Sequence, residues 1–159
     1  MSIDIPEEVL ARIVADVIQE HIGAQGSPGE QVDGPFVRDR SGVIGIDVPK
    51  IQPTPFPLPL PDDVPPNSVR LVDLLAEQES PRVGCGVMEI DRAAFDWTLK
   101  YDEIDYVISG TLELIMNGRP VRATAGQAIF IPKNTLVRFS TPDNVRFFYV
   151  VYPINWSEQ

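Results

Sequence analysis

Apolar residues recur along the 159-residue chain with two different periods. Over residues 4–22 they return every three or four positions, which places them along one side of an α-helix. This stripe consists of Val9, Leu10, Ile13, Val14, Val17, Ile18 and Ile22. Charged and amide side chains take the opposite face, and Gly23 ends the pattern. The sequence therefore predicts an amphipathic helix within residues 1–22.

Residues 23–48 have neither period and begin with a stretch rich in Gly, Ser and Pro. Such a composition is typical of a flexible linker. A short helix on a loose tether cannot bury its apolar stripe without a surface outside itself. Two alternatives are possible for this surface. The helix could dock on the chain's own barrel, expected within residues 67–159, or on a dimer mate, or it could bind a groove on a partner protein.

Residues 49–66 contain eight of the 16 prolines, which excludes helix and forces an extended backbone. Apolar side chains such as Phe56 and Leu58 alternate with these prolines, which is unusual for a bare linker. We predict an arm over residues 49–66. It either wraps its own barrel or a neighbour's, or binds an aromatic groove elsewhere.

From Val69 onward the apolar period is two, which is typical of β-strands. Strands are expected near residues 69–75, 83–90, 95–99, 103–109, 111–117, 120–124, 127–132, 136–140 and 145–152. Asn117-Gly118 is a strong hairpin turn signal. No helical segment intervenes, so residues 67–159 predict a mainly β domain, a sandwich or a jelly-roll barrel.

The composition excludes several classes of protein. A net charge of −10 gives no basic surface for nucleic-acid phosphates. A lone cysteine, Cys85, cannot form an internal disulfide and fits a reducing cytosol. No stretch is long and apolar enough to span a bilayer, and the acidic N-terminus is unlike a signal peptide. We expect a soluble, cytoplasmic protein that binds neither membrane nor nucleic acid.

Two segments of the β region have the spacing of the two cupin motifs. Glu103 precedes Gly110 by the motif distance, and Gly126 precedes Pro132 likewise. The three histidine positions of those motifs hold Trp97, Leu99 and Val137, or Asp96 and Thr98 for the first two in the longer spacing. Imidazoles make such a site select a transition metal, and one carboxylate cannot replace three of them. The chain resembles a cupin, a double-stranded β-helix barrel, and we expect no metal in it.

A more specific resemblance covers residues 69–156. The runs that carry it are residues 79–84, 96–107, 129–133 and 145–156. They are similar to those of the EutQ family, the ethanolamine-utilisation cupins of bacterial microcompartment operons. The resemblance implies a metal-free cupin, located in the cytoplasm within a bacterial microcompartment, and an acetate kinase activity. The N-terminal helix and its linker resemble the encapsulation peptides of microcompartment cargo.

In a cupin the pocket is the mouth of the barrel, lined by alternate residues of the motif strands. If Glu103 points inward, so does Asp105, and together they could form a general base. Lys100 completes the predicted catalytic set. The predicted pocket residues are Trp97, Leu99, Tyr101, Val137, Phe139 and Tyr149. The last strand turns inward either Phe147, Tyr149 and Val151 or Phe148, Val150 and Tyr152, and the first set is preferred because it supplies a hydroxyl.

No Gly-rich phosphate-binding loop is present in the sequence. If the kinase reading holds, ATP or ADP and Mg²⁺ are needed, with Glu103 and Asp105 as candidate Mg²⁺ ligands. Lys100, Lys133 or Arg138 would bind phosphate oxygens. No cofactor is expected to be tightly bound, and the pocket would take a small organic acid or a nucleotide.

Two other functions stay open. One is a non-catalytic assembly factor that binds microcompartment shell or core proteins through residues 4–22. The other is a cupin that senses an organic acid. An open, polar mouth favours the enzyme or the sensor, and a mouth plugged by Trp97 and Leu99 favours the assembly factor. A homodimer is expected, with the arm at its interface.

The apolar stripe of residues 4–22 generates a direct test. We expect residues 1–34 fused to a fluorescent reporter to enter microcompartments, because the stripe Leu10, Ile13, Val14, Val17 and Ile18 needs a partner surface. Ile13→Glu with Val17→Glu should disperse the reporter, as seen by fluorescence microscopy. A wild-type fusion that stays diffuse in compartment-forming cells would contradict this prediction and favour docking on the barrel.

Overall fold

The computed structural model describes residues 30–158. The chain forms two compact units, and the boundary between them in the sequence falls between Lys50 and Ile51. The helix predicted within residues 1–22, with its stripe Leu10, Ile13, Val14, Val17 and Ile18, lies outside the described residues. So does the start of the predicted linker.

The first unit contains a three-stranded antiparallel sheet. Its strands are β1 (Glu30–Asp33), β2 (Phe36–Asp39) and β3 (Ile44–Ile46), followed by the 3-10 turn η1 (Val48–Lys50). Tight turns at Gly34 and Gly42, both with positive φ, join the strands. The flexible linker predicted for residues 23–48 is therefore wrong over residues 30–46. The strands of the first unit are short, and none of the described residues of this unit is buried. The alternation of apolar and polar residues that predicts a strand is therefore weak in this part of the sequence.

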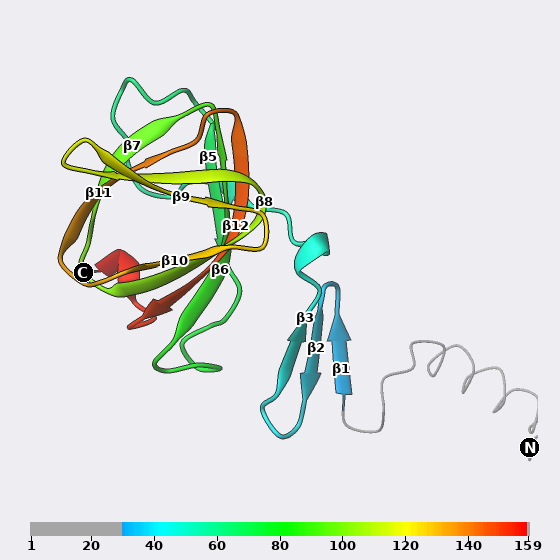
Figure 1. Ribbon diagram of the computed structural model, residues 1–159. Coiled ribbons are helices and arrows are strands. Elements are labelled where there is room, and N and C mark those ends of the chain that lie inside the picture. The colour runs from blue at the N-terminus through cyan, green and yellow to red at the C-terminus, as the bar shows by residue number, and fades with distance from the viewer. Residues whose placement is uncertain (1–29, 159) are drawn as a thin grey trace, which may run out of the picture. The chain divides into compact units, whose positions relative to one another are not determined.

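The second unit is a curled sheet (Figure 1). Its strands run in the order β4-β5-β6-β12-β8-β11-β7, and β9 and β10 also pair with β8. Their bounds are β4 (Thr54–Pro55), β5 (Val69–Asp73), β6 (Gly84–Asp91), β7 (Ala94–Leu99), β8 (Asp102–Met116), β9 (Arg119–Thr124), β10 (Ala128–Ile131), β11 (Thr135–Ser140) and β12 (Asn144–Tyr152), with the 3-10 turn η2 (Trp156–Glu158) after them. The mainly β architecture predicted from the period of two is confirmed.

The two strands predicted for residues 103–109 and 111–117 are one strand, β8. Gly110 lies at the bend in its middle with φ of +80°, and a Cβ there would lie 2.0 Å from the Asn144 carbonyl oxygen. Close to this bend β8 has a bulge: Arg146 and Phe147 of β12 pair with Ser109 and Val107, which leaves Ile108 of β8 as the extra residue. The glycine thus lets the strand bend where the sequence pattern predicts a break.

Alternate residues of the strands fill the interior of the barrel. Phe147, Tyr149 and Val151 are each at most 3 % exposed, which confirms the preferred inward set of the last strand. Cys85 is also buried, and burial together with the charge of Asp73 raises the pKa of its thiol to about 11. Cys85 is therefore an inert strand residue at neutral pH.

The proline-rich arm lies on the barrel of its own chain from Ile51 onward. Its strand β4 pairs with β5, and Phe56, Leu58 and Leu60 pack against the barrel core. The arm therefore wraps its own barrel, one of the two fates predicted for it.

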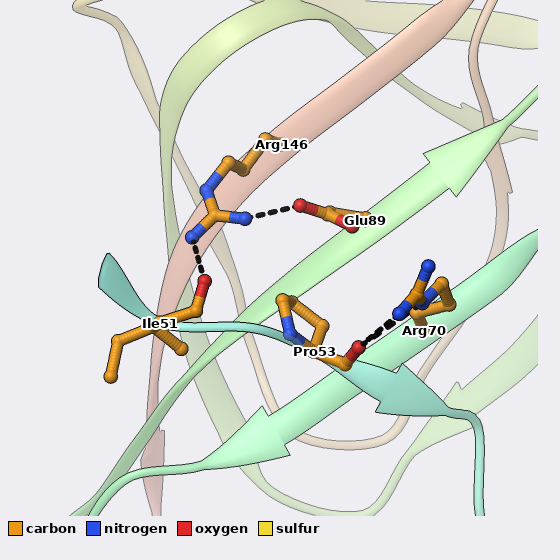
Figure 2. A network of polar contacts seen from close by, with 5 residues as sticks. All are labelled: Ile51, Pro53, Arg70, Glu89 and Arg146. Atoms are coloured by element: carbon orange, nitrogen blue, oxygen red, sulfur yellow. Dashed lines mark hydrogen bonds and ion pairs between the residues drawn. The ribbon is translucent and has the colours of Figure 1, made fainter. Parts of the chain in front are cut away.

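Two arginines hold the start of the arm by its backbone oxygens (Figure 2). Arg70 donates from Nε and Nη2 to the Pro53 carbonyl at 3.1 and 2.7 Å. Arg146 donates from Nη2 to the Ile51 carbonyl at 2.8 Å, and its Nη1 forms an ion pair with Glu89. The prolines of this segment have no N–H group, so the segment cannot form a complete ladder of backbone hydrogen bonds with the sheet. The arginine side chains instead provide hydrogen bonds to its carbonyl oxygens.

The contact between Gly86 and Tyr149 generates a stability prediction. A Cβ at Gly86 would lie 2.1 Å from Tyr149 Oη and 2.5 Å from the Val72 carbonyl oxygen. Gly86→Ala should lower the free energy of unfolding by about 1–3 kcal/mol, because a packed interior does not absorb an extra methyl group. Urea denaturation followed by tryptophan fluorescence measures this change.

The matched control is Gly45→Ala, where the nearest atom to the new Cβ lies 3.8 Å away. It should change stability little. In a Tyr149→Leu background the effect of Gly86→Ala should shrink, because the clashing ring is gone. An equal loss in both backgrounds would show that the Tyr149 ring is not the cause.

Candidate functional site

Two carboxyl groups occupy successive inward positions of β8. Glu103 lies opposite Ile131 of β10 and Val151 of β12, and Asp105 lies opposite Tyr149 on β12. Glu103 is 7 % exposed and Asp105 is fully buried. The alternation of a β-strand therefore places both acids in the interior, as the sequence predicts.

The carboxyl pair is short of hydrogen-bond donors. Within the described part of the chain, neither oxygen of Asp105 accepts a hydrogen bond from an N–H or hydroxyl donor. The carboxyl group of Glu103 is its hydrogen-bonding neighbour. Two carboxylates are both acceptors, so they can bond to each other only when one of them carries a proton.

Desolvation keeps that proton on the pair. Burial raises the pKa of Glu103 to about 7, and burial together with the charge of Glu103 raises the pKa of Asp105 well above its usual range. The charged form of a buried acid is disfavoured, and two neighbouring acids disfavour it further. At neutral pH the pair therefore holds at least one proton and can donate it in a hydrogen bond.

Three aromatic rings close the barrel at the end where Glu103 lies, and we call Phe56, Trp97 and Trp156 the aromatic plug. The Phe56 ring meets Trp97 edge-on at 5.6 Å between centroids and lies 6.5 Å from Trp156. The rings of Trp97 and Trp156 are 6.4 Å apart. These distances are those of a packed aromatic cluster.

Hydrogen bonds fix the two indoles of the plug. Trp97 donates from Nε1 to Tyr101 Oη at 3.0 Å. Trp156 donates from Nε1 to Asp73 Oδ1 at 3.1 Å, and Tyr149 donates from Oη to the same oxygen at 2.7 Å. Burial raises the pKa of Tyr101 and of Tyr149 far above the usual value, so both phenols keep their protons.

Little space remains beside the acids. Two cavities of about 20 Å³ each adjoin Glu103, and each has room for about one water molecule. Their lining is Leu71, Met88, Tyr101, Glu103, Tyr149 and Trp156 for one, and Phe56, Met88, Phe95, Trp97, Tyr101, Glu103, Phe139 and Trp156 for the other. Of the two alternatives left open by the sequence, an open mouth and one plugged by Trp97 and Leu99, the structure has a closed mouth, in which Trp97 is joined by Phe56 and Trp156 and not by Leu99.

The predicted pocket residues meet different fates. Trp97, Tyr101, Phe139 and Tyr149 line the two cavities. Leu99 and Val137 are buried in the core and line neither cavity. They are part of the filling of the barrel instead of the wall of an open pocket.

The structure does not bring the third predicted catalytic residue to the acids. Lys100 is exposed in the turn between β7 and β8. The other two candidate cations also lie outside the cavities: Lys133 is exposed, and Arg138 forms an ion pair with Asp96 at 3.2 Å. No cation lines either cavity beside Glu103, so nothing there neutralises a phosphate group.

The sequence analysis missed Phe56 and Trp156 as site residues. A phenylalanine between prolines predicts burial but not where, and Trp156 follows the last strand with no period to place it. The only sequence feature that Phe56 and Trp156 share with Trp97 is an aromatic side chain. That feature is too common to predict that the three rings lie in contact.

The Mg²⁺ ligands proposed from the sequence do not fit the closed barrel. Mg²⁺ requires near-octahedral oxygen ligands and usually keeps several waters. The cavities beside Glu103 have room for about one water, and the carboxyl pair retains a proton. Among residues 30–158 no group of three or more His, Cys, Asp or Glu side chains is placed to hold a metal ion.

A larger hollow of about 360 Å³ lies by β5, β6 and β12, lined among others by Arg70, Arg146 and Ser109. Ser109 and Glu103 are six residues apart on β8, which is roughly 20 Å along a strand. A ligand in this hollow could not react with one held at Glu103.

Over the residues described, no helix has the length and apolar character needed to cross a membrane.

Comparison with known proteins identifies the family of the chain. The family model "Ethanolamine utilisation protein EutQ" matches residues 5–158. The protein "Acetate kinase EutQ" of Clostridioides difficile is 42% identical over 156 residues, which cover 98% of this chain and 97% of that protein.

Solved structures agree. The Clostridium difficile EutQ structure is similar with a TM-score of 0.69 at 43% identity, covering 81% of this chain and 93% of the other. The cupin domain of Schizosaccharomyces pombe Cnp3 matches with a TM-score of 0.54 at 14% identity, covering 72% and 77% respectively, which shows the shared cupin fold alone. The cupin barrel predicted from the motif spacing is confirmed, and the chain belongs to the EutQ family of ethanolamine utilisation proteins.

Proposed function

We propose that this protein is an acetate kinase that acts in ethanolamine utilisation, transferring a phosphoryl group between ATP and acetate. The observation that carries the proposal is the relative named as an acetate kinase, with which the chain shares 42% of residues over nearly the whole length of both. In the reaction an acetate oxygen attacks the γ-phosphorus, and the bond from that phosphorus to the bridging oxygen breaks. ADP leaves and acetyl phosphate forms. Mg²⁺ enters with ATP as part of the substrate.

The closed barrel limits where each substrate could bind. ATP is far larger than the cavities beside Glu103, so its phosphates would have to lie outside the barrel mouth. Lys100 and Lys133 are exposed and could meet phosphate oxygens there. Glu103 and Asp105, which hold a proton, suit a hydrogen bond to a carboxylate better than a bond to a metal.

The filled interior favours a second candidate, a non-catalytic assembly factor for the microcompartment. A mouth plugged by aromatic side chains is what this function predicts, since the barrel would then serve only as a folded support. In that function, residues 4–22 bind shell or core proteins. Recruitment to a microcompartment in the cytoplasm is part of both proposals, and the reporter fusion of residues 1–34 tests it.

A kinase assay separates the two candidates. Glu103→Gln should lower the rate of acetyl phosphate formation from ATP and acetate at least about 100-fold, because it removes the proton-bearing carboxyl group while conserving the shape of the side chain. The control is Glu77→Gln, the same chemical change in an exposed loop residue.

The melting temperature of each variant shows that loss of activity is not loss of fold. Full activity in Glu103→Gln would remove this residue from the reaction. A well-folded wild-type protein without any turnover would instead leave the assembly function.

The homodimer expected from the sequence remains a proposal, but the arm is not its basis because the arm is seated on its own barrel. Support comes from the outer face of β8 and β10, where Ile104 and Phe130 lie in register and are 48 and 61 % exposed. Tyr106 and Tyr152 add exposed apolar area on β8 and β12. A second copy related by a two-fold axis could cover this face on both barrels.

We expect light scattering at micromolar concentration to report a dimer. Ile104→Lys with Phe130→Glu should produce a folded monomer, because charged groups would have to be buried in the interface. A control double change of the exposed Val121 and Leu136, to Lys and Glu respectively, should leave the dimer intact. A wild-type monomer, or an unchanged dimer in the first variant, would contradict this interface.

A further inference from the structure

We propose that the arm is the gate of the barrel, with Phe56 as its stopper, over a binding site for a small monocarboxylic acid beside Glu103 and Asp105. The inference rests on the proposed function in taking acetate as the acid. It assigns a place for that substrate and a segment that controls its entry.

The buried acids are the reason to expect a ligand. Buried polar atoms in proteins almost always have hydrogen-bond partners, yet apart from the carboxyl group of Glu103 neither oxygen of Asp105 has a donor among the described residues. Asp105 lines neither cavity, but Glu103 lines both, so a small carboxylic acid placed there could bond to Glu103 and share the proton of the pair. Apolar groups of Leu71, Met88 and Phe139, which line the two cavities, suit a short aliphatic tail.

The position of Phe56 makes it the stopper. One cavity beside Glu103 is walled by Phe56, and both cavities share Met88, Tyr101 and Trp156. Each cavity alone is about 20 Å³, the size of one water, and is too small for an acid of four heavy atoms. Withdrawal of the Phe56 ring adds its own volume to the space beside Glu103.

Phe56 is also the member of the aromatic plug that can leave. Hydrogen bonds hold the side chains of Trp97 and Trp156, to Tyr101 and Asp73 respectively. The half-buried ring of Phe56 is held by packing against other rings and the barrel core, with no hydrogen bond from its side chain. The ring can therefore move out without leaving a side-chain donor or acceptor unpaired, and movement of the backbone there breaks one bond, from the Phe56 N–H to the Val69 carbonyl.

The attachment of the arm suits a segment that opens. Strand β4 has only two residues, and the surrounding prolines supply no N–H groups to a ladder. The polar attachment includes the arginine contacts to the Pro53 and Ile51 carbonyls (Figure 2) and a bond from the Phe56 N–H to the Val69 carbonyl at 3.0 Å, while Phe56, Leu58 and Leu60 pack on the core. Arg70 is exposed, so on opening its donors exchange the Pro53 oxygen for water.

The charges around the site determine how the acid binds. The titratable groups that line the cavities or interact with their lining are Glu103, Asp105, Tyr101, Tyr149, Asp73 and Cys85, and none of these is a cation. A carboxylate can enter such a site only if a proton accompanies it or is already on the pair. Binding should therefore be tighter at about pH 6 than at about pH 8, because protons are taken up with the ligand.

Acetate binding to the full-length protein tests the gate. Carbon-13 NMR of labelled acetate, with calorimetry, gives the affinity and the exchange rate without any need for turnover. If the open state is a minor population, Phe56→Ala should tighten the apparent affinity at least about tenfold. Glu103→Gln and Asp105→Asn should each weaken it in that background. Leu136→Ala, an exposed apolar residue of β11, is the control and should change nothing.

A cross-link provides a second test, in which the oxidised and reduced forms of one molecule carry the same shortened side chain at Leu71 and differ only in whether the arm can move. Thr54 and Leu71 lie directly opposite each other in the β4–β5 pairing, at a separation suited to a disulfide. In a Cys85→Ala background, Thr54→Cys with Leu71→Cys should bind acetate when reduced and stop binding it when oxidised. The same molecule serves as its own control.

The gate is refuted if Phe56→Ala binds acetate no better than wild type, or if the oxidised cross-linked protein binds as well as the reduced one. Absence of acetate binding in both wild type and Phe56→Ala refutes the acid site. These outcomes are independent of the kinase assay. If the protein shows no turnover but its acetate binding depends on Phe56 and the cross-link, the kinase proposal is wrong and the gate is supported. If the protein is an active kinase but its acetate binding is unchanged by Phe56→Ala and by the cross-link, the kinase proposal is supported and the gate is wrong.

Discussion

The desolvation of two neighbouring carboxyl groups is the constraint around which the barrel is organised. Glu103 and Asp105 follow from the two-residue period of β8, which turns both into an interior otherwise filled by apolar side chains. Burial removes their water and raises the pKa of each. The pair therefore exists at neutral pH as a proton-bearing unit, whose chemistry is that of a hydrogen-bond donor to an acid, and not that of a divalent metal site.

The aromatic plug and the arm follow from that constraint. The acid pair keeps its raised pKa and its proton only if water stays out, and Phe56, Trp97 and Trp156 exclude water from the mouth. The indoles are oriented by hydrogen bonds, whereas Phe56 is delivered from a segment outside the barrel domain predicted from the sequence. Arg70 and Arg146 fix the start of this segment, so contacts on the outside of the sheet determine what closes its inside.

This arrangement reconciles an enzyme family with a barrel that has no open pocket. A phosphoryl transfer needs a dry site for the acceptor and cations for the phosphates. Under the proposed gate, the interior would supply the dry site to a molecule as small as acetate once Phe56 moves, and the exposed Lys100 and Lys133 are the candidate cations. The same closed barrel also suits the second proposal, an assembly factor in which the barrel only supports the helix predicted from the sequence of residues 4–22. Turnover and acetate binding, measured separately, decide between these roles.

The sequence by itself determined the local features of this protein. The period of two determined the β class, most strand positions and the inward set Phe147, Tyr149 and Val151, because side-chain alternation is a property of neighbouring residues. It also placed Glu103 and Asp105 together on one face. Only the tertiary structure decided that Phe56 and Trp156 meet Trp97, that Lys100 stays outside, and that Arg70 and Arg146 hold the arm. Those contacts join residues far apart in the chain, and they depend on the curvature of the closed sheet and on the volume left inside it, which no local pattern encodes.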